Sequence, residues 1–155
     1  MVRLDVASPD VAWATMTISP APAQRFPIAV GRKSRWLLRL FGVTGSNAYV
    51  DLDGDLDARF GFGHLRTPLD NVASWRIEGP WLWITAIGIR RNWLKSDLAF
   101  DGVHQGGVRI EFRVPARSFG LGVTALYVTV ADIDGFVGAL RARGIDGIDA
   151  RRPSR

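Results

Sequence analysis

The sequence predicts a mainly β protein in which one C-terminal α-helix follows the strands. Alternation of apolar and polar residues, typical of half-buried strands, recurs through most of the 155 residues. Only one segment, beyond residue 131, changes to the residue spacing of a helix. We therefore expect about seven antiparallel strands in two packed sheets or a partly closed barrel, with the helix capping an open end.

The clearest strand pairing is a hairpin centred on Asp53-Gly54. Apolar residues alternate on both sides of this dipeptide, which supplies the positive φ angles that a tight hairpin turn needs. An EF-hand loop beginning at Asp51 would need glycine where Leu56 stands and glutamate where Phe62 stands. We therefore expect no metal site. The outer face of the hairpin carries Asp51, Asp53, Asp55 and Asp57.

The other strands are shorter or less regular. Residues 25–31 contain a proline and suit the edge of a sheet. Residues 35–41 are compatible with a short helix or a strand. Residues 108–114 alternate most cleanly, with the even-numbered residues facing inward. The remaining strand candidates are residues 11–19, 65–69, 73–78, 94–100 and 126–130.

The predicted helix follows the last strand. Its apolar residues, at positions 133, 136, 137 and 140, fall on one stripe of a helix. Asp132 stands at the N-cap, where its side chain can accept backbone N–H bonds, and Gly144 can end the helix. We predict one domain over residues 1–149, followed by a flexible basic tail over residues 150–155.

Composition excludes several kinds of chemistry. The chain has no cysteine, which excludes disulfides, thiolate zinc sites and cysteine nucleophiles. No serine stands in a Gly-x-Ser-x-Gly elbow, and only two histidines, His64 and His104, are present. No apolar run approaches the ~20 residues that span a membrane, and a signal pattern is missing. We expect no catalytic residues, no cofactor and a cytoplasmic location, with contact at the membrane surface left open.

The most unusual stretch runs from Gly79 to Lys95. It holds three of the six tryptophans and no acidic residue. An inner strand covered on both faces would have the same composition. Exposed indole rings beside cations would instead suit an anionic lipid surface, a protein partner or a second copy of the chain. This predicted Trp/Arg surface comprises Trp81, Trp83, Arg90, Arg91, Trp93 and Lys95.

A second predicted surface is the basic cluster of Arg32, Lys33 and Arg35, continued by Arg39. Such a cluster is typical of a solvated face, but it could also attract the phosphates of lipids or nucleic acid. The net charge of +5 favours neither partner. Nucleic acid is the less favoured of the two, because the basic residues form no extended stripe.

Residues 36–144 contain four characteristic blocks. They are FGVTGSNAYVDLDGDLDARFG (41–61), TPLDNVASWRIEGPW (67–81), LAFDGVHQGGVRIEFRVP (98–115) and LYVTVADIDGFVGALRARG (126–144). These blocks resemble a group of conserved, uncharacterised proteins of mycobacteria and related actinobacteria, a resemblance that implies no particular catalytic residue. The order of strands and closing helix is also similar to the pleckstrin-homology-type barrel. That similarity implies binding of lipid headgroups, peptides or proteins.

These observations predict a non-enzymatic binding or interaction module that contacts an anionic lipid surface or a protein partner. The alternative is a carrier of a small apolar ligand, or a cryptic enzyme, that uses the barrel interior beneath residues 81–89. This alternative requires a closed cavity of several hundred Å³, the usual size of a ligand pocket.

Overall fold

A computed structural model describes residues 21–31, 35–40, 42–79, 88–92, 97–101 and 106–151. Within these residues all ten strands belong to one mixed sheet. The strands are β1 (Gln24–Pro27), β2 (Ala48–Asp53), β3 (Asp55–Phe60), β4 (Gly63–Pro68), β5 (Val72–Glu78), β6 (Gly88–Asn92), β7 (Asp97–Asp101), β8 (Gly107–Ser118), β9 (Leu121–Val128) and β10 (Gly147–Asp149). The helices are α1 (Arg35–Leu40), the 3-10 turn η1 (Leu69–Asn71) and α2 (Ile133–Ala142).

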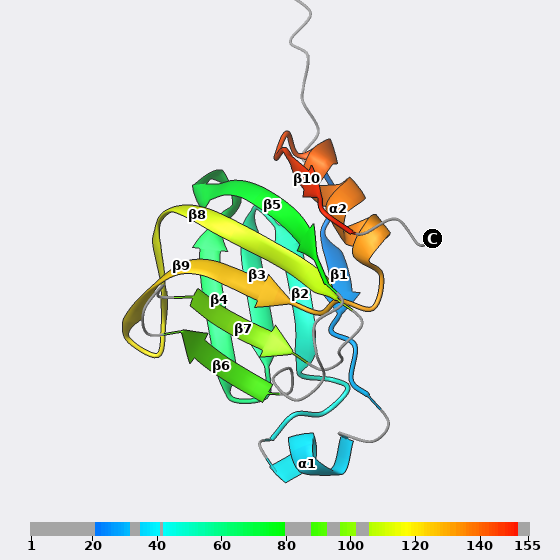
Figure 1. Ribbon diagram of the computed structural model, residues 1–155. Coiled ribbons are helices and arrows are strands. Elements are labelled where there is room, and N and C mark those ends of the chain that lie inside the picture. The colour runs from blue at the N-terminus through cyan, green and yellow to red at the C-terminus, as the bar shows by residue number, and fades with distance from the viewer. Residues whose placement is uncertain are drawn as a thin grey trace, which may run out of the picture.

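The long strand β8 joins two layers of the sheet. The strand order is β1-β2-β3-β4-β8-β9-β7-β6, and β5 pairs with both β8 and β10. Figure 1 shows β2, β3 and β4 behind, with β5, β8, β9, β7 and β6 crossing in front of them. A bridge between Ile28 and Val130 also brings the chain after β1 beside the chain after β9.

The local predictions that rest on turn and cap chemistry are confirmed. β2 and β3 form the expected antiparallel hairpin, and Gly54 in its turn has a φ of 70°. α2 begins where predicted, because the Asp132 carboxylate accepts a hydrogen bond of 2.9 Å from the Gly135 backbone N–H. The candidate strand over residues 11–19 lies outside the described residues.

The prediction of an exclusively antiparallel sheet is wrong. β7 pairs with β9 in parallel, and β10 pairs with β5 in parallel. The chain reaches β10 only after α2, and such a crossover can bring a strand back in either direction. Apolar alternation marks a half-buried strand but says nothing of its neighbour's direction. A partly closed barrel of the pleckstrin-homology type stays a prediction.

The core lies between the two layers. Its largest side chains include Trp75, Phe60 and Phe100, and the rings of Phe60 and Phe100 stack with centroids 6.0 Å apart. α2 packs on this core through Phe136, whose ring meets that of Phe26 edge-on at 5.1 Å. In the described part of the chain, no helix has the length and apolar character needed to cross a membrane.

Val114, which the sequence predicts to face inward, is exposed, and so is the apolar residue Ala73 of β5. Ala73 is exposed because the register with β8 shifts between Val72 and Ser74, which turns Val72 into the core instead. Val114 is 65% exposed and lies in a stretch of β8 for which neither β4 nor β9 supplies a paired residue. Alternation fails at these points because extra residues in one strand shift the register, a single one in β5 between Val72 and Ser74 and several in β8 between Glu111 and Ala116.

The side chain of Asn71 takes the place of a neighbouring strand beside Val114. Its Nδ2 donates to the Val114 carbonyl oxygen at 2.9 Å, and its Oδ1 accepts from the Val114 N–H, also at 2.9 Å. Nδ2 further donates to the Thr67 hydroxyl at 2.9 Å. Asn71 thus holds the bend of β8 onto the end of β4.

We expect Asn71→Ala to lower the free energy of unfolding by about 1–2 kcal/mol, because these backbone groups lose partners that water only partly replaces. Urea denaturation measures the change. Asn71→Asp keeps the acceptor for the Val114 N–H but loses the donor, so we expect an intermediate loss. An unchanged urea midpoint in Asn71→Ala would refute the bracing role.

The first residues of the predicted tail are attached to the domain. The Ala150 N–H donates to the Ile77 carbonyl oxygen at 3.1 Å, and Arg151 pairs with Asp134 and Asp149. Hydrogen bonds from the Arg151 side chain and backbone hold the pKa of Asp149 below its ordinary value of 3.8. Residues 152–155 lie outside the described part of the chain.

Because the folded-state pKa of Asp149 is lowered, its contribution to stability is present above pH 3.8 and is lost as the pH falls through the lowered pKa. We expect Arg151→Gln to lower the melting temperature slightly at pH 7. The difference from wild type should vanish in strong acid. Thermal unfolding between pH 2 and pH 7 tests this, and a difference that persists unchanged at pH 2 would exclude this carboxylate as its source.

Candidate interaction surface

Most of the predicted Trp/Arg surface lies outside the described residues. Arg90 and Arg91 are in β6, whose backbone pairs with β7 and whose side chains are not described. Arg35 is the first residue of α1 and is exposed. The predicted residues outside the described part of the chain are Trp81, Trp83, Trp93, Lys95, Arg32 and Lys33.

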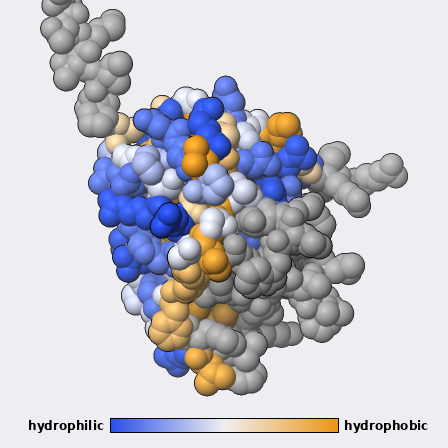
Figure 2. All heavy atoms as spheres, turned by 90° about the vertical axis from the view of Figure 1, so that its left-hand side faces the viewer, coloured by the Kyte–Doolittle hydropathy of each residue, from blue (hydrophilic) through white to orange (hydrophobic). Residues whose placement is uncertain are grey.

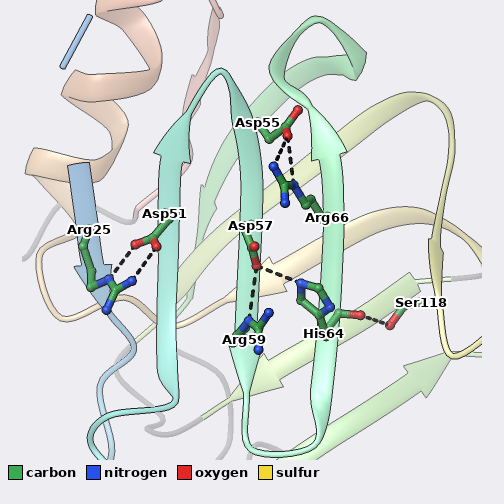
Figure 3. Close-up of polar contacts among 8 residues, drawn as sticks. All are labelled: Arg25, Asp51, Asp55, Asp57, Arg59, His64, Arg66 and Ser118. Atoms are coloured by element: carbon green, nitrogen blue, oxygen red, sulfur yellow. Dashed lines mark hydrogen bonds and ion pairs between the residues drawn. The ribbon is translucent and has the colours of Figure 1, made fainter. Parts of the chain in front are cut away.

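The outer face of β1–β4 is polar, and ion pairs hold most of its acidic groups (Figure 3). Arg25 donates twice to Asp51, at 2.8 and 2.7 Å, and Asp55 lies 2.7 Å from Arg66. These hydrogen bonds raise the pKa of both arginines above the ordinary value. Exposed pairs of this kind contribute little to stability, but they neutralise the acidic outer face predicted for the hairpin.

A serine, a histidine and an aspartate meet at the other end of this face, but not as a catalytic relay. The His64 ring Nε2 lies 2.9 Å from Asp57 Oδ1, and Arg59 Nε lies 3.7 Å from the same oxygen. The Ser118 hydroxyl donates to the His64 backbone carbonyl at 2.7 Å, as Figure 3 shows. Because this bond bypasses the imidazole ring, the arrangement has no pairing of nucleophile and base.

Exposed apolar side chains gather where two hairpins turn. Phe62 lies in the turn between β3 and β4 and is 73% exposed, and Phe119 lies in the turn between β8 and β9 and is 61% exposed. These turns are neighbours, because Arg66 of β4 pairs with Arg117 of β8. Leu121, two residues after Phe119, is the first residue of β9. We call the set Leu40, Phe62, Phe119 and Leu121 the apolar end.

The end of α1 belongs to the same surface. A Cβ added to Gly42 would lie 2.7 Å from the Phe62 ring, which places the residues after α1 directly against that turn. Leu40, the last residue of α1, is 78% exposed. Figure 2, viewed from the left of Figure 1, shows apolar residues along the lower edge of the described surface, bordering a hydrophilic face.

Phe119 has an unfavourable backbone conformation. Its φ of 53° makes it the only non-glycine residue with positive φ among the described residues. The left-handed region costs an L-residue about 1–2 kcal/mol, and turns of this kind favour glycine, asparagine or aspartate. A ring that is mostly exposed gains little from burial to offset this cost. Strained residues of this kind gather at functional sites.

The sequence did not reveal the apolar end. Phe62 lies within Gly61-Phe62-Gly63, and Phe119 stands directly before Gly120. The sequence signal that could have indicated it is an aromatic residue inside a turn sequence, where polar residues and glycine are usual. Comparisons with known proteins find no family model, curated protein or solved structure that matches the chain.

Proposed function

We propose that this chain is a non-catalytic binding module that docks on a membrane surface through the apolar end. The observation that carries the proposal is Phe119, a mostly exposed aromatic residue held in a strained turn. Such a conformation costs stability in the free protein. Burial of the ring in an apolar environment after docking would compensate for that cost.

The shape of this surface favours a membrane over a protein partner. Its apolar side chains come from separate segments: two turns, the first residue of β9 and the last residue of the short helix α1. Phe and Leu side chains at such tips can enter the 5–10 Å boundary between headgroups and acyl chains. The ion pairs Arg25–Asp51 and Arg66–Asp55, farther along the strands, would stop deeper insertion, because charged groups are costly to bury.

The size of the apolar end suits weak, reversible binding. Burial of four such side chains at about 1.5 kcal/mol each supplies roughly 6 kcal/mol. This binding free energy is similar to that of a single myristoyl chain, which binds membranes with an association constant of ~10⁴ M⁻¹. A second attraction would therefore be needed for stable attachment.

For the scaffold of this module we propose a partly closed barrel of the pleckstrin-homology type. The bridge between Ile28 and Val130 supports it, since it brings the first described strand beside the chain that leaves β9. The position of α2, after β9 and against the core, also supports it. The rigid sheet would keep the two hairpin turns at fixed positions.

Vesicle sedimentation of the full chain tests the proposal. We expect wild type to sediment with phosphatidylcholine vesicles that contain phosphatidylglycerol, and Phe62→Ser to bind about tenfold more weakly. Ile148→Ser is the matched control, because Ile148 is 57% exposed on β10, outside the apolar end. We expect this control to bind as wild type does.

Three results would overturn the proposal. Wild type could stay in the supernatant, or Ile148→Ser could lose as much binding as Phe62→Ser. In the third, light scattering without vesicles would show a mass that grows with protein concentration and that Phe62→Ser abolishes. That result would assign the apolar end to a second copy of the chain.

A further inference from the structure

The cations beside the apolar end indicate which class of lipid it meets. Resting on the function proposed above, we propose that the docked surface is anionic and that Arg35, Arg39 and Arg117 bind its phosphate headgroups. These arginines would supply the second attraction that the apolar side chains alone lack.

Two of the arginines lie on α1. Arg35 and Arg39 are four residues apart, so they share one face of the helix, and both are exposed. Leu38 anchors the helix, since its side chain is buried in the core. Because Gly42 lies against the Phe62 ring, this cationic face stands next to the apolar end.

The third arginine lies on β8. Arg117 is exposed and precedes Phe119 by two residues, opposite Arg66 of β4. No acidic side chain in the described ranges forms an ion pair with Arg35, Arg39 or Arg117. Arg25, Arg66, Arg109 and Arg151, by contrast, are each paired with carboxylates. The arginines of this end are therefore available to an external anion.

Acidic residues gather at the opposite ends of the same strands. Asp53 and Asp55 flank the turn between β2 and β3, and Asp70 lies in η1 after β4. Figure 3 shows Asp55 near that turn, with Arg59 and His64 toward the turn that carries Phe62. Arg66 neutralises Asp55, but Asp53 and Asp70 form no ion pair within the described ranges. An anionic surface would therefore attract the apolar end and repel the end that carries Asp53 and Asp70, and so orient the molecule.

The test compares neutral with anionic vesicles. We expect wild type to bind vesicles that contain phosphatidylglycerol at least 20-fold more tightly than pure phosphatidylcholine at low salt. High salt should remove most of this difference. Each arginine near the surface contributes roughly fivefold, so Arg35→Gln/Arg39→Gln should weaken anionic binding about 25-fold.

The matched control is Arg76→Gln/Arg113→Gln. It removes the same two formal charges from exposed positions on β5 and β8, and Arg113 lies beside η1, where it donates to the Asp70 carbonyl. We expect this control to lose less than threefold. A loss equal to that of Arg35→Gln/Arg39→Gln would show that only net charge matters, and would overturn the assignment to α1.

The two proposals fail in different ways. If wild type binds both vesicles equally and Phe62→Ser still weakens binding, the anionic preference is wrong and membrane docking stands. If the arginine variants weaken binding but Phe62→Ser does not, docking through the apolar end is wrong. Binding to a DNA duplex that is tighter than binding to anionic vesicles, and insensitive to Phe62→Ser, would overturn both.

Discussion

Trp75→Ala is expected to lower the free energy of unfolding by about 4 kcal/mol, the usual cost of removing a buried aromatic side chain. Trp75 of β5 is 1% exposed, and its indole N–H donates to the Ile145 carbonyl oxygen at 2.9 Å. The Arg141 guanidinium of α2 lies 4.8 Å from the ring centroid. One side chain therefore ties β5 to α2 and to the chain that leads into β10.

A loss of this size is a large part of the 5–15 kcal/mol that stabilises an ordinary domain. We expect the melting temperature to fall by about 8–16 °C, from ~2–4 °C per kcal/mol at this chain length. Trp75→Phe retains most of the packing and loses the bond to Ile145, so about half the loss or less should follow. Urea denaturation measures the free energy of unfolding of each variant. If Trp75→Ala loses no more of it than the surface variant Ile148→Ser, this description of the core is wrong.

The double variant Phe62→Ser/Phe119→Asn should weaken vesicle binding at least 100-fold. The two rings stand on separate turns, so we expect their contributions of about 1.5 kcal/mol or more each to add. Asparagine is chosen at position 119 because it tolerates positive φ. Partition between vesicles and buffer, measured by sedimentation over a range of lipid concentrations, gives the change.

The matched control for this double variant is Val114→Ser/Ile148→Ser. Val114 and Ile148, at 65% and 57%, are nearly as exposed as Phe62 and Phe119, at 73% and 61%, but lie outside the apolar end. We expect a change of less than threefold. Equal losses in the two double variants would mean that exposed apolar area, wherever it lies, determines binding.

The elements fixed by local chemistry could be predicted from the sequence. Asp53-Gly54 forces a tight turn and Asp132 caps a helix, and both effects depend only on a few adjacent residues. The parallel partners of β7 and β10 depend on contacts between distant segments. Ala73 and Val114 are exposed because of register shifts with β8 and β9, which hydropathy alternation cannot reveal.

The candidate site was harder to predict than the fold. Composition drew attention to residues 81–95, where tryptophan and arginine are dense, whereas the exposed side chains of the apolar end are single aromatic and aliphatic residues. A lone phenylalanine usually belongs to the core. Arg35 and Arg39 belong both to the surfaces predicted from the sequence and to the surface proposed from the structure.

The free energy of unfolding and the vesicle affinity of Phe119→Asn, measured on one preparation, examine the proposed docking surface at its key residue. We expect the variant to be more stable than wild type by about 1 kcal/mol, because asparagine relieves the strain of the left-handed turn. We expect it to bind vesicles about tenfold more weakly. A variant that is less stable and binds as tightly as wild type would show that Phe119 serves packing alone, and would contradict docking through the apolar end.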